Sequence, residues 1–168
     1  MLKKVVVVVF ILCAAGCEKN NWQTMDLDLV TGIYLRQTPH SPAIKLGNPN
    51  VFEGALILSP NPPFDFIGVM SDAAISDIWI IPAEAKKILS KTDFSDVYNT
   101  NTYSESQIAS HSVLTLSDQG RESITLNIQD LEEGYYRIFV KTQGGIYWDN
   151  FYKAGPDFDL EGFIESWH

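Results

Sequence analysis

Short apolar or alternating runs recur along the chain from Leu29 onward, separated by clusters of Gly, Pro and Asn. Runs of this length between turn residues are typical of antiparallel strands in an all-β domain. The expected strands are residues 32–37, 43–46, 54–59, 64–70, 76–81, 112–116, 123–129, 135–142 and 146–152. The pattern therefore predicts an antiparallel β-sandwich over residues 29–156.

The C-terminal third carries the clearest strand pattern. Apolar and polar residues alternate over 123–129, so one face of this strand is expected in a core and the other in water. Gln143-Gly144-Gly145 separates the runs 135–142 and 146–152, and its glycines can adopt the positive φ angles of a tight turn. We expect these two runs to pair as a β-hairpin.

Two segments have helical features. Residues 82–91 open with Pro82, which suits a first helical turn, and continue with good helix formers. The stretch 92–110 that follows is rich in Ser, Thr, Asn and Tyr and predicts a long loop. The tail 157–168 is expected to be a short C-terminal helix, capped by Asp157 or Asp159. Its apolar residues form one helical stripe: Leu160, Phe163, Ile164 and Trp167.

The first residues have the order of an exported chain. Lys3 and Lys4 precede an apolar segment that is too short to cross a membrane, and small residues follow it. This order predicts a signal peptide over residues 1–16. Ala14-Ala15-Gly16-Cys17 then resembles the lipobox of bacterial lipoproteins, although the family usually has Leu where this chain has Ala14.

The lipobox resemblance implies cleavage before Cys17 and lipidation of its thiol. Cys13 would leave with the leader, so the mature chain would contain no disulfide. Residues 17–28 would form a tether between the lipid and the folded domain. Since Glu18 replaces the Asp that retains enterobacterial lipoproteins in the inner membrane, the resemblance implies the outer membrane of a Gram-negative cell, with the side of the membrane left open.

The domain itself also resembles a known family. Pro60-Asn61-Pro62 comes early in the domain, and Leu131, Gly134 and Tyr136 form a Leu-x-x-Gly-x-Tyr motif before the hairpin. This order is similar to the Ig-like C-terminal sorting domain of the type IX secretion system of Bacteroidetes, over residues 56–153. The resemblance implies an Ig-like β-sandwich in which the tyrosine closes a corner by bonding to backbone. Because a lipobox already supplies an export route, we do not carry over the sorting function.

Composition narrows the function classes. The chain has 12 Lys and Arg residues against 21 Asp and Glu residues, a formal charge of −9, so it should repel nucleic acid. No residues have the pattern of a catalytic site, a metal site or a cofactor loop. The sequence therefore predicts neither an enzyme nor a cofactor.

Aromatic residues are concentrated in the last hairpin. They are Tyr135, Phe139, Tyr147, Trp148, Phe151 and Tyr152, and they fall on both faces of the hairpin. One face must be core; the other, if open, would be a platform for a sugar ring or a protein, unless the C-terminal helix or the N-terminal strands cover it. The leading hypothesis is a non-enzymatic envelope lipoprotein that presents a protein-binding or scaffolding module, and the alternative is a carbohydrate-binding outer-membrane lipoprotein.

Overall fold

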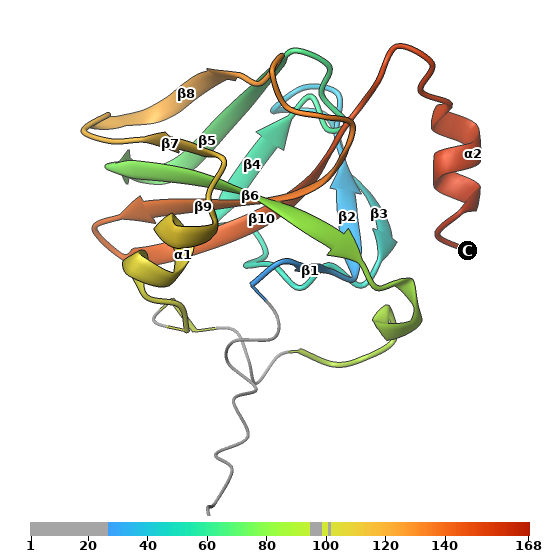
Figure 1. Ribbon diagram of the computed structural model, residues 1–168, viewed down its shortest axis with the longest axis horizontal. Coiled ribbons are helices and arrows are strands. Elements are labelled where there is room, and N and C mark those ends of the chain that lie inside the picture. The colour runs from blue at the N-terminus through green and yellow to red at the C-terminus, as the bar shows by residue number, and fades with distance from the viewer. Residues whose placement is uncertain (1–26, 95–98, 101) are drawn as a thin grey trace, which may run out of the picture.

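The computed structural model describes residues 27–94, 99–100 and 102–168 (Figure 1). The described strands are β1 (Leu29–Val30), β2 (Gly32–Leu35), β3 (Ile44–Gly47), β4 (Leu56–Ser59), β5 (Phe66–Ile75), β6 (Asp77–Ala85), β7 (Leu114–Leu116), β8 (Arg121–Asn127), β9 (Gly134–Thr142) and β10 (Gly145–Lys153). The helical elements are α1 (Glu105–His111), α2 (Leu160–Glu165) and the 3₁₀ turn η2 (Lys87–Leu89). The leader, Cys17 and most of the tether lie outside the described residues.

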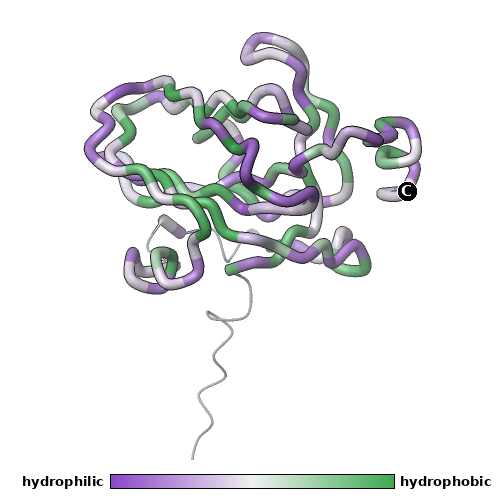
Figure 2. The backbone as a smooth tube through the Cα atoms, turned by 45° about the horizontal axis from the view of Figure 1, so that its top comes forward, coloured by the Kyte–Doolittle hydropathy of each residue, from purple (hydrophilic) through white to green (hydrophobic). Residues whose placement is uncertain are grey.

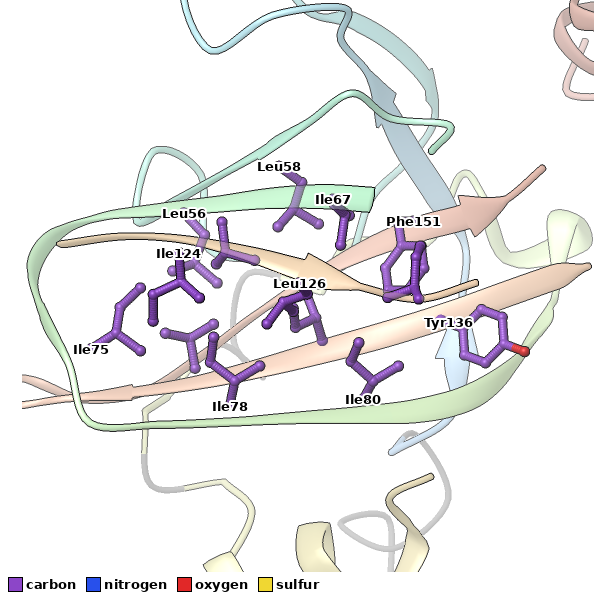
Figure 3. Packing of buried hydrophobic residues seen from close by; sticks show 14 residues of the cluster. Leu56, Leu58, Ile67, Ile75, Ile78, Ile80, Ile124, Leu126, Tyr136 and Phe151 are labelled. Atoms are coloured by element: carbon purple, nitrogen blue, oxygen red, sulfur yellow. The ribbon is translucent and has the colours of Figure 1, made fainter. Parts of the chain in front are cut away.

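Two sheets enclose the main core, so the fold is mostly β and sandwich-like. One sheet has the order β4-β5-β8, and the other has the order β1-β6-β9-β10 with β7 also paired to β6. Apolar side chains of both sheets meet between the two layers (Figure 3). The core residues are Leu56, Leu58, Ile67, Val69, Ile75, Ile78, Ile80, Ile124, Leu126, Ile128, Tyr136, Ile138, Val140 and Phe151.

The chain passes directly from one layer to the other at Ser76. This residue alone separates β5 from β6, and its N–H donates to the Lys141 carbonyl of β9 at 2.8 Å. In Figure 3 the ribbon of β5 bends round at Ile75 and returns as β6 in the opposite layer. The bend closes one end of the sandwich.

The predicted hairpin is confirmed. β9 and β10 pair antiparallel from Gly134↔Lys153 to Thr142↔Gly145. The hydroxyl of Tyr136, near the start of β9, donates at 2.9 Å to the carbonyl of Glu132, which precedes the strand. This bond closes a corner between Tyr136 and the preceding turn, as the Leu-x-x-Gly-x-Tyr motif predicts.

A third layer covers the outer face of the β6-β9-β10 sheet. Ile108 of α1 and Tyr103 lie over Trp79, Phe139 and Trp148, all of them buried. Hydrophobic stretches gather along the packed strands, while much of the chain at the outline of the molecule is hydrophilic (Figure 2). Both faces of this sheet are therefore apolar, which explains why its strands carry apolar residues at successive positions.

The helix predicted over 82–91 is wrong in its first half. β6 continues through Pro82 to Ala85, and only the short turn η2 follows. Along the edge of β6, β7 pairs as far as Ile80 and β1 begins at Glu84, so Pro82 falls between the two partner strands. A residue without an N–H is tolerated at that gap, and tertiary pairing overrides the local preference for helix.

The stretch 92–110 is not only a loop, since α1 begins within it at Glu105. The Ser104 hydroxyl accepts from the Gln107 N–H at 3.3 Å, and the Gln107 side chain accepts from the Ser104 N–H at 2.9 Å. This reciprocal pair is a capping box, and its Ser-x-x-Gln signature is visible in the sequence.

The C-terminal helix is confirmed but is shorter than residues 157–168. α2 spans Leu160–Glu165, and the Asp159 carboxylate caps it by accepting from the Glu161 N–H at 3.1 Å. Trp167 lies beyond the helix end and is buried against β2 and β3. None of the described helices is long and apolar enough to cross a membrane.

Candidate functional site

Three of the six aromatic residues predicted on the hairpin surface are buried. Phe151 faces the core between the sheets, where its ring stacks on Tyr136 with centroids 5.2 Å apart. Phe139 and Trp148 face the opposite side of the sheet, and they are 0% and 2% exposed. These three residues therefore cannot belong to an exposed ring platform, because both faces of the sheet are covered where they lie.

Tyr135, Tyr147 and Tyr152 are half-buried. Phe163 of α2 packs on Tyr135 and Tyr152, with centroid distances of 6.0 and 4.8 Å. The ring of Phe52 meets Tyr147 edge-on at 5.2 Å. The C-terminal helix and the segment after β3 thus cover much of the aromatic surface, which strand alternation alone does not indicate.

An apolar groove of about 620 Å³ lies between α2, the start of β3 and the turn after β4. Ile44, Phe64 and Leu160 line it and are 56%, 52% and 47% exposed. Single exposed apolar residues are ordinary on protein surfaces, but a group of them in one depression marks an interaction site. We define these residues and the depression they line as the α2 groove.

The turn that forms one wall of the α2 groove is anchored by Asn61. Its backbone N–H and carbonyl pair with the carbonyl and N–H of Arg36 at 2.7 and 2.9 Å. Its buried side-chain amide donates to the Tyr34 carbonyl at 2.8 Å and to the Asn150 carbonyl at 3.0 Å. One side chain thus ties this wall to β2 and β10, which gives a structural role to the Pro-Asn-Pro motif.

The other wall is α2, which is held at its C-terminal end. Lys87 Nζ donates to the Ser166 carbonyl and hydroxyl at 3.0 and 2.9 Å and lies 5.2 Å from the centre of the Trp167 ring. The acidic residues on and beside the helix are exposed, although the Asp159 carboxylate also caps the helix. They are Asp157, Asp159, Glu161 and Glu165.

A buried polar network joins the N-terminal segment to the hairpin. Arg137 is fully buried, and its Nε donates to Asn150 Oδ1 at 3.1 Å. Its guanidinium also donates to the carbonyls of Leu27 and Leu29. The Asn150 amide donates in turn to the Gly32 carbonyl at 3.1 Å. These bonds satisfy backbone groups of β1 and β2, so the network has a structural role.

A second cavity, of about 390 Å³, contains a buried carboxyl group. Asp149 of β10 is 7% exposed and lines this cavity with Tyr34, Arg36 and Glu53. Burial raises the pKa of Asp149 to about 7, although the Asn150 N–H and two nearby arginines favour the charged form. The burial of this aspartate depends on the position of β10 in the sheet, so it becomes evident only in the folded chain.

Among the described residues, no three His, Cys, Asp or Glu side chains gather as ligands for a metal ion. No protein-family model matches the chain, and no curated protein matches it. Function is therefore inferred from the geometry of the molecule.

Proposed function

We propose that this protein is a non-enzymatic lipoprotein of the cell envelope that binds a partner protein through the α2 groove. The observation that carries this proposal is the gathering of Ile44, Phe64 and Leu160, each about half exposed, in one groove. Burying apolar surface contributes about 25 cal/mol per Å², so a groove of this kind can supply much of the affinity for a polypeptide.

The charge around the α2 groove indicates what its partner should look like. Arg36 is the charged residue among those that line the groove, but four acidic residues on and beside α2 are exposed around it, and the whole chain has a formal charge of −9. A segment with apolar residues flanked by Lys or Arg would fill the groove and complement these charges. The proposed occupant is therefore an apolar, basic-flanked segment of another envelope protein.

The location in this proposal rests on the leader. Lys3-Lys4, the short apolar segment and Ala14-Ala15-Gly16-Cys17 support export and lipidation of Cys17. Several acyl chains on one residue would hold the protein stably at a membrane. Glu18, in place of an Asp after the cysteine, favours the outer membrane. The tether would then display the groove away from the lipid surface.

The finer fold assignment is part of the same proposal. Two packed sheets and the Tyr136 corner support an Ig-like sandwich, as the resemblance to the sorting domain implies. Ig-like sandwiches serve many unrelated functions, so the fold alone does not select the partner.

The carbohydrate-binding alternative has less support. It depends on exposed rings beside polar groups, but Phe139, Trp148 and Phe151 are buried, and Phe163 covers Tyr135 and Tyr152. The apolar lining of the α2 groove also suits a polypeptide better than a sugar.

Site-specific cross-linking in the native envelope tests the proposal. A photo-reactive residue at Phe64 should cross-link one envelope protein, while the same residue at Val113, which is 54% exposed on another part of the surface, should not. Mapping of the cross-link should identify an apolar segment flanked by Lys or Arg. Ile44→Glu should abolish the cross-link, and Val113→Glu should leave it unchanged.

Three results would contradict this function: identical products from both positions, no product from Phe64, or a product that contains only a second copy of this chain. A glycan array run with the same preparation tests the alternative. Specific glycan binding that survives Ile44→Glu would favour the carbohydrate-binding alternative.

A further inference from the structure

The cavity around Asp149 differs from the α2 groove because acidic residues are part of its lining. It lies between β2, β4 and β10, and its size of about 390 Å³ is near the lower end for small-molecule sites. Val51, Leu56 and Leu58 give it an apolar wall. A small ligand with an apolar body would fit this space.

Asp149 occupies an inward-facing position of its strand. In the β9–β10 register it pairs with Ile138, and the next inward residue, Phe151, pairs with Tyr136. Ile138, Tyr136 and Phe151 all belong to the core between the sheets. A carboxyl group thus stands where the alternation of the strand calls for an apolar residue. Departures from local pattern at buried positions concentrate at functional sites.

This carboxyl group keeps bonding capacity toward the cavity. In the described part of the chain, its hydrogen bond is the one that Oδ1 accepts from the Asn150 N–H at 2.7 Å. The side chain is more than nine-tenths buried and lines the cavity. A carboxylate can accept several hydrogen bonds, so a ligand that donates a charged hydrogen bond to this group would be favoured.

The other polar groups of the cavity favour a cation. Glu53 adds a second carboxylate, and the aromatic residues Tyr34 and Phe52 also line the cavity. Arg36 is the opposing charge, but it donates through Nη1 to the Pro39 carbonyl at 3.2 Å, outside the residues that line the cavity. Among the residues that line the cavity, two carboxylates thus face one guanidinium. The buried Arg137 also acts on Asp149, but it does not line the cavity and donates to Asn150 and to the carbonyls of Leu27 and Leu29.

We propose that this cavity binds a small organic cation, a protonated primary amine on an apolar body, with the ammonium group held by Asp149 and Glu53. The apolar body lies against Val51, Leu56 and Leu58. The inference goes beyond the proposed partner binding, because Arg36 is the one residue that lines both sites and amine binding does not require the α2 groove to be occupied.

Calorimetric titration of the full chain tests the site with two probes of nearly the same shape. 2-Phenylethylammonium should bind, and neutral 2-phenylethanol should bind about tenfold more weakly or not at all, since one charged hydrogen bond is at stake. Asp149→Asn should reduce amine affinity about tenfold or more by the same reasoning, and Glu53→Gln by a smaller factor. Glu161→Gln, which removes an exposed charge on α2, is the matched control and should change nothing.

Glu53 is exposed, so Glu53→Gln keeps the test valid if Asp149→Asn fails to fold. Absence of saturable amine binding to the wild-type chain overturns the inference. So does equal binding of the amine and the alcohol, or amine affinity that neither cavity variant changes. Cross-linking at Phe64 reports separately on the α2 groove, so failure of one proposal does not imply failure of the other.

Discussion

Burial of one carboxyl group makes stability depend on pH at the scale of a single residue. Asp149 has a pKa of about 7 in the folded chain, against an ordinary value of 3.8. Between these values the folded state holds a proton that the unfolded state has lost. The free energy of unfolding should therefore fall as pH rises from about 4 to about 7. This contribution is fully present below pH 4 and is lost as pH rises through 7.

We predict that Asp149→Asn removes this pH dependence of the free energy of unfolding. The wild-type chain should lose at most roughly 4 kcal/mol relative to the Asn variant over this range, since each pKa unit corresponds to about 1.4 kcal/mol. The charged and titratable groups that bear on Asp149 are Arg36 and Arg137, which favour its ionised form, with Tyr34 and Glu53 across the cavity. Urea unfolding at a series of pH values measures the difference, and Asp157→Asn, an exposed change, is the control. Parallel pH profiles for wild type and Asp149→Asn would refute this account of the buried acid.

Strands and the hairpin could be predicted from sequence at the scale of elements because their signals are local. Alternation over 123–129 and the glycines at 144–145 need no knowledge of the rest of the chain. Pro82 misled the prediction because its tolerance in β6 depends on the gap between β7 and β1, which the sequence does not display. The capping box at Ser104 is a local signal for a helix, but the prediction of a loop over 92–110 did not take it into account.

Candidate sites are harder to predict for the same physical reason. The α2 groove joins residues near positions 44, 64 and 160, and only the folded arrangement brings them together. Burial of Phe139 and Trp148 likewise depends on α1 and Tyr103 covering the second face of the sheet. An aromatic count along one hairpin does not indicate which of its faces remains open.

At the scale of elements, we predict that the Ser104 cap stabilises α1. Ser104→Ala removes the acceptor for the Gln107 N–H and should destabilise the protein by about 1 kcal/mol, the usual effect of losing an N-cap. The neighbouring Ser106→Ala removes an exposed hydroxyl that lies 3.1 Å from the Ser104 hydroxyl, but it leaves the capping box in place and adds a better helix former, so it should cost much less. Chemical unfolding of the full chain compares the two variants. Equal destabilisation by both would show that the capping box does not hold α1 over the sheet.

The docking of α2 links the chain end to the sheets at the scale of the whole molecule. Trp167 is 8% exposed and packs with Val30, Ile33 and Leu46, so the last residues close a core built by the first described strands. Trp167→Ala should cost about 3 kcal/mol and release α2, since a truncated core aromatic leaves a cavity. Amide hydrogen exchange should then show lost protection in α2 with retained protection in β9 and β10. Protection of α2 equal to that of wild type would contradict this role for Trp167.

Separation of the anchor from the fold is the last prediction at this scale. The described residues form three buried apolar clusters, and the cysteines of the chain are Cys13 and Cys17, so folding should require neither the lipid nor a disulfide. Cys17→Ser should therefore move the protein from the detergent phase to the aqueous phase, because the acyl chains that hold it are lost. Its unfolding midpoint should equal that of the wild-type chain with or without a reducing agent. Cys13→Ser is the matched control, since this residue would leave with the leader, and it should keep the protein in the detergent phase. Retention of Cys17→Ser in the detergent phase would mean that something other than lipidation at Cys17 holds this protein at a membrane. The proposed lipid anchor would then be wrong, while the proposal for the α2 groove would be unaffected.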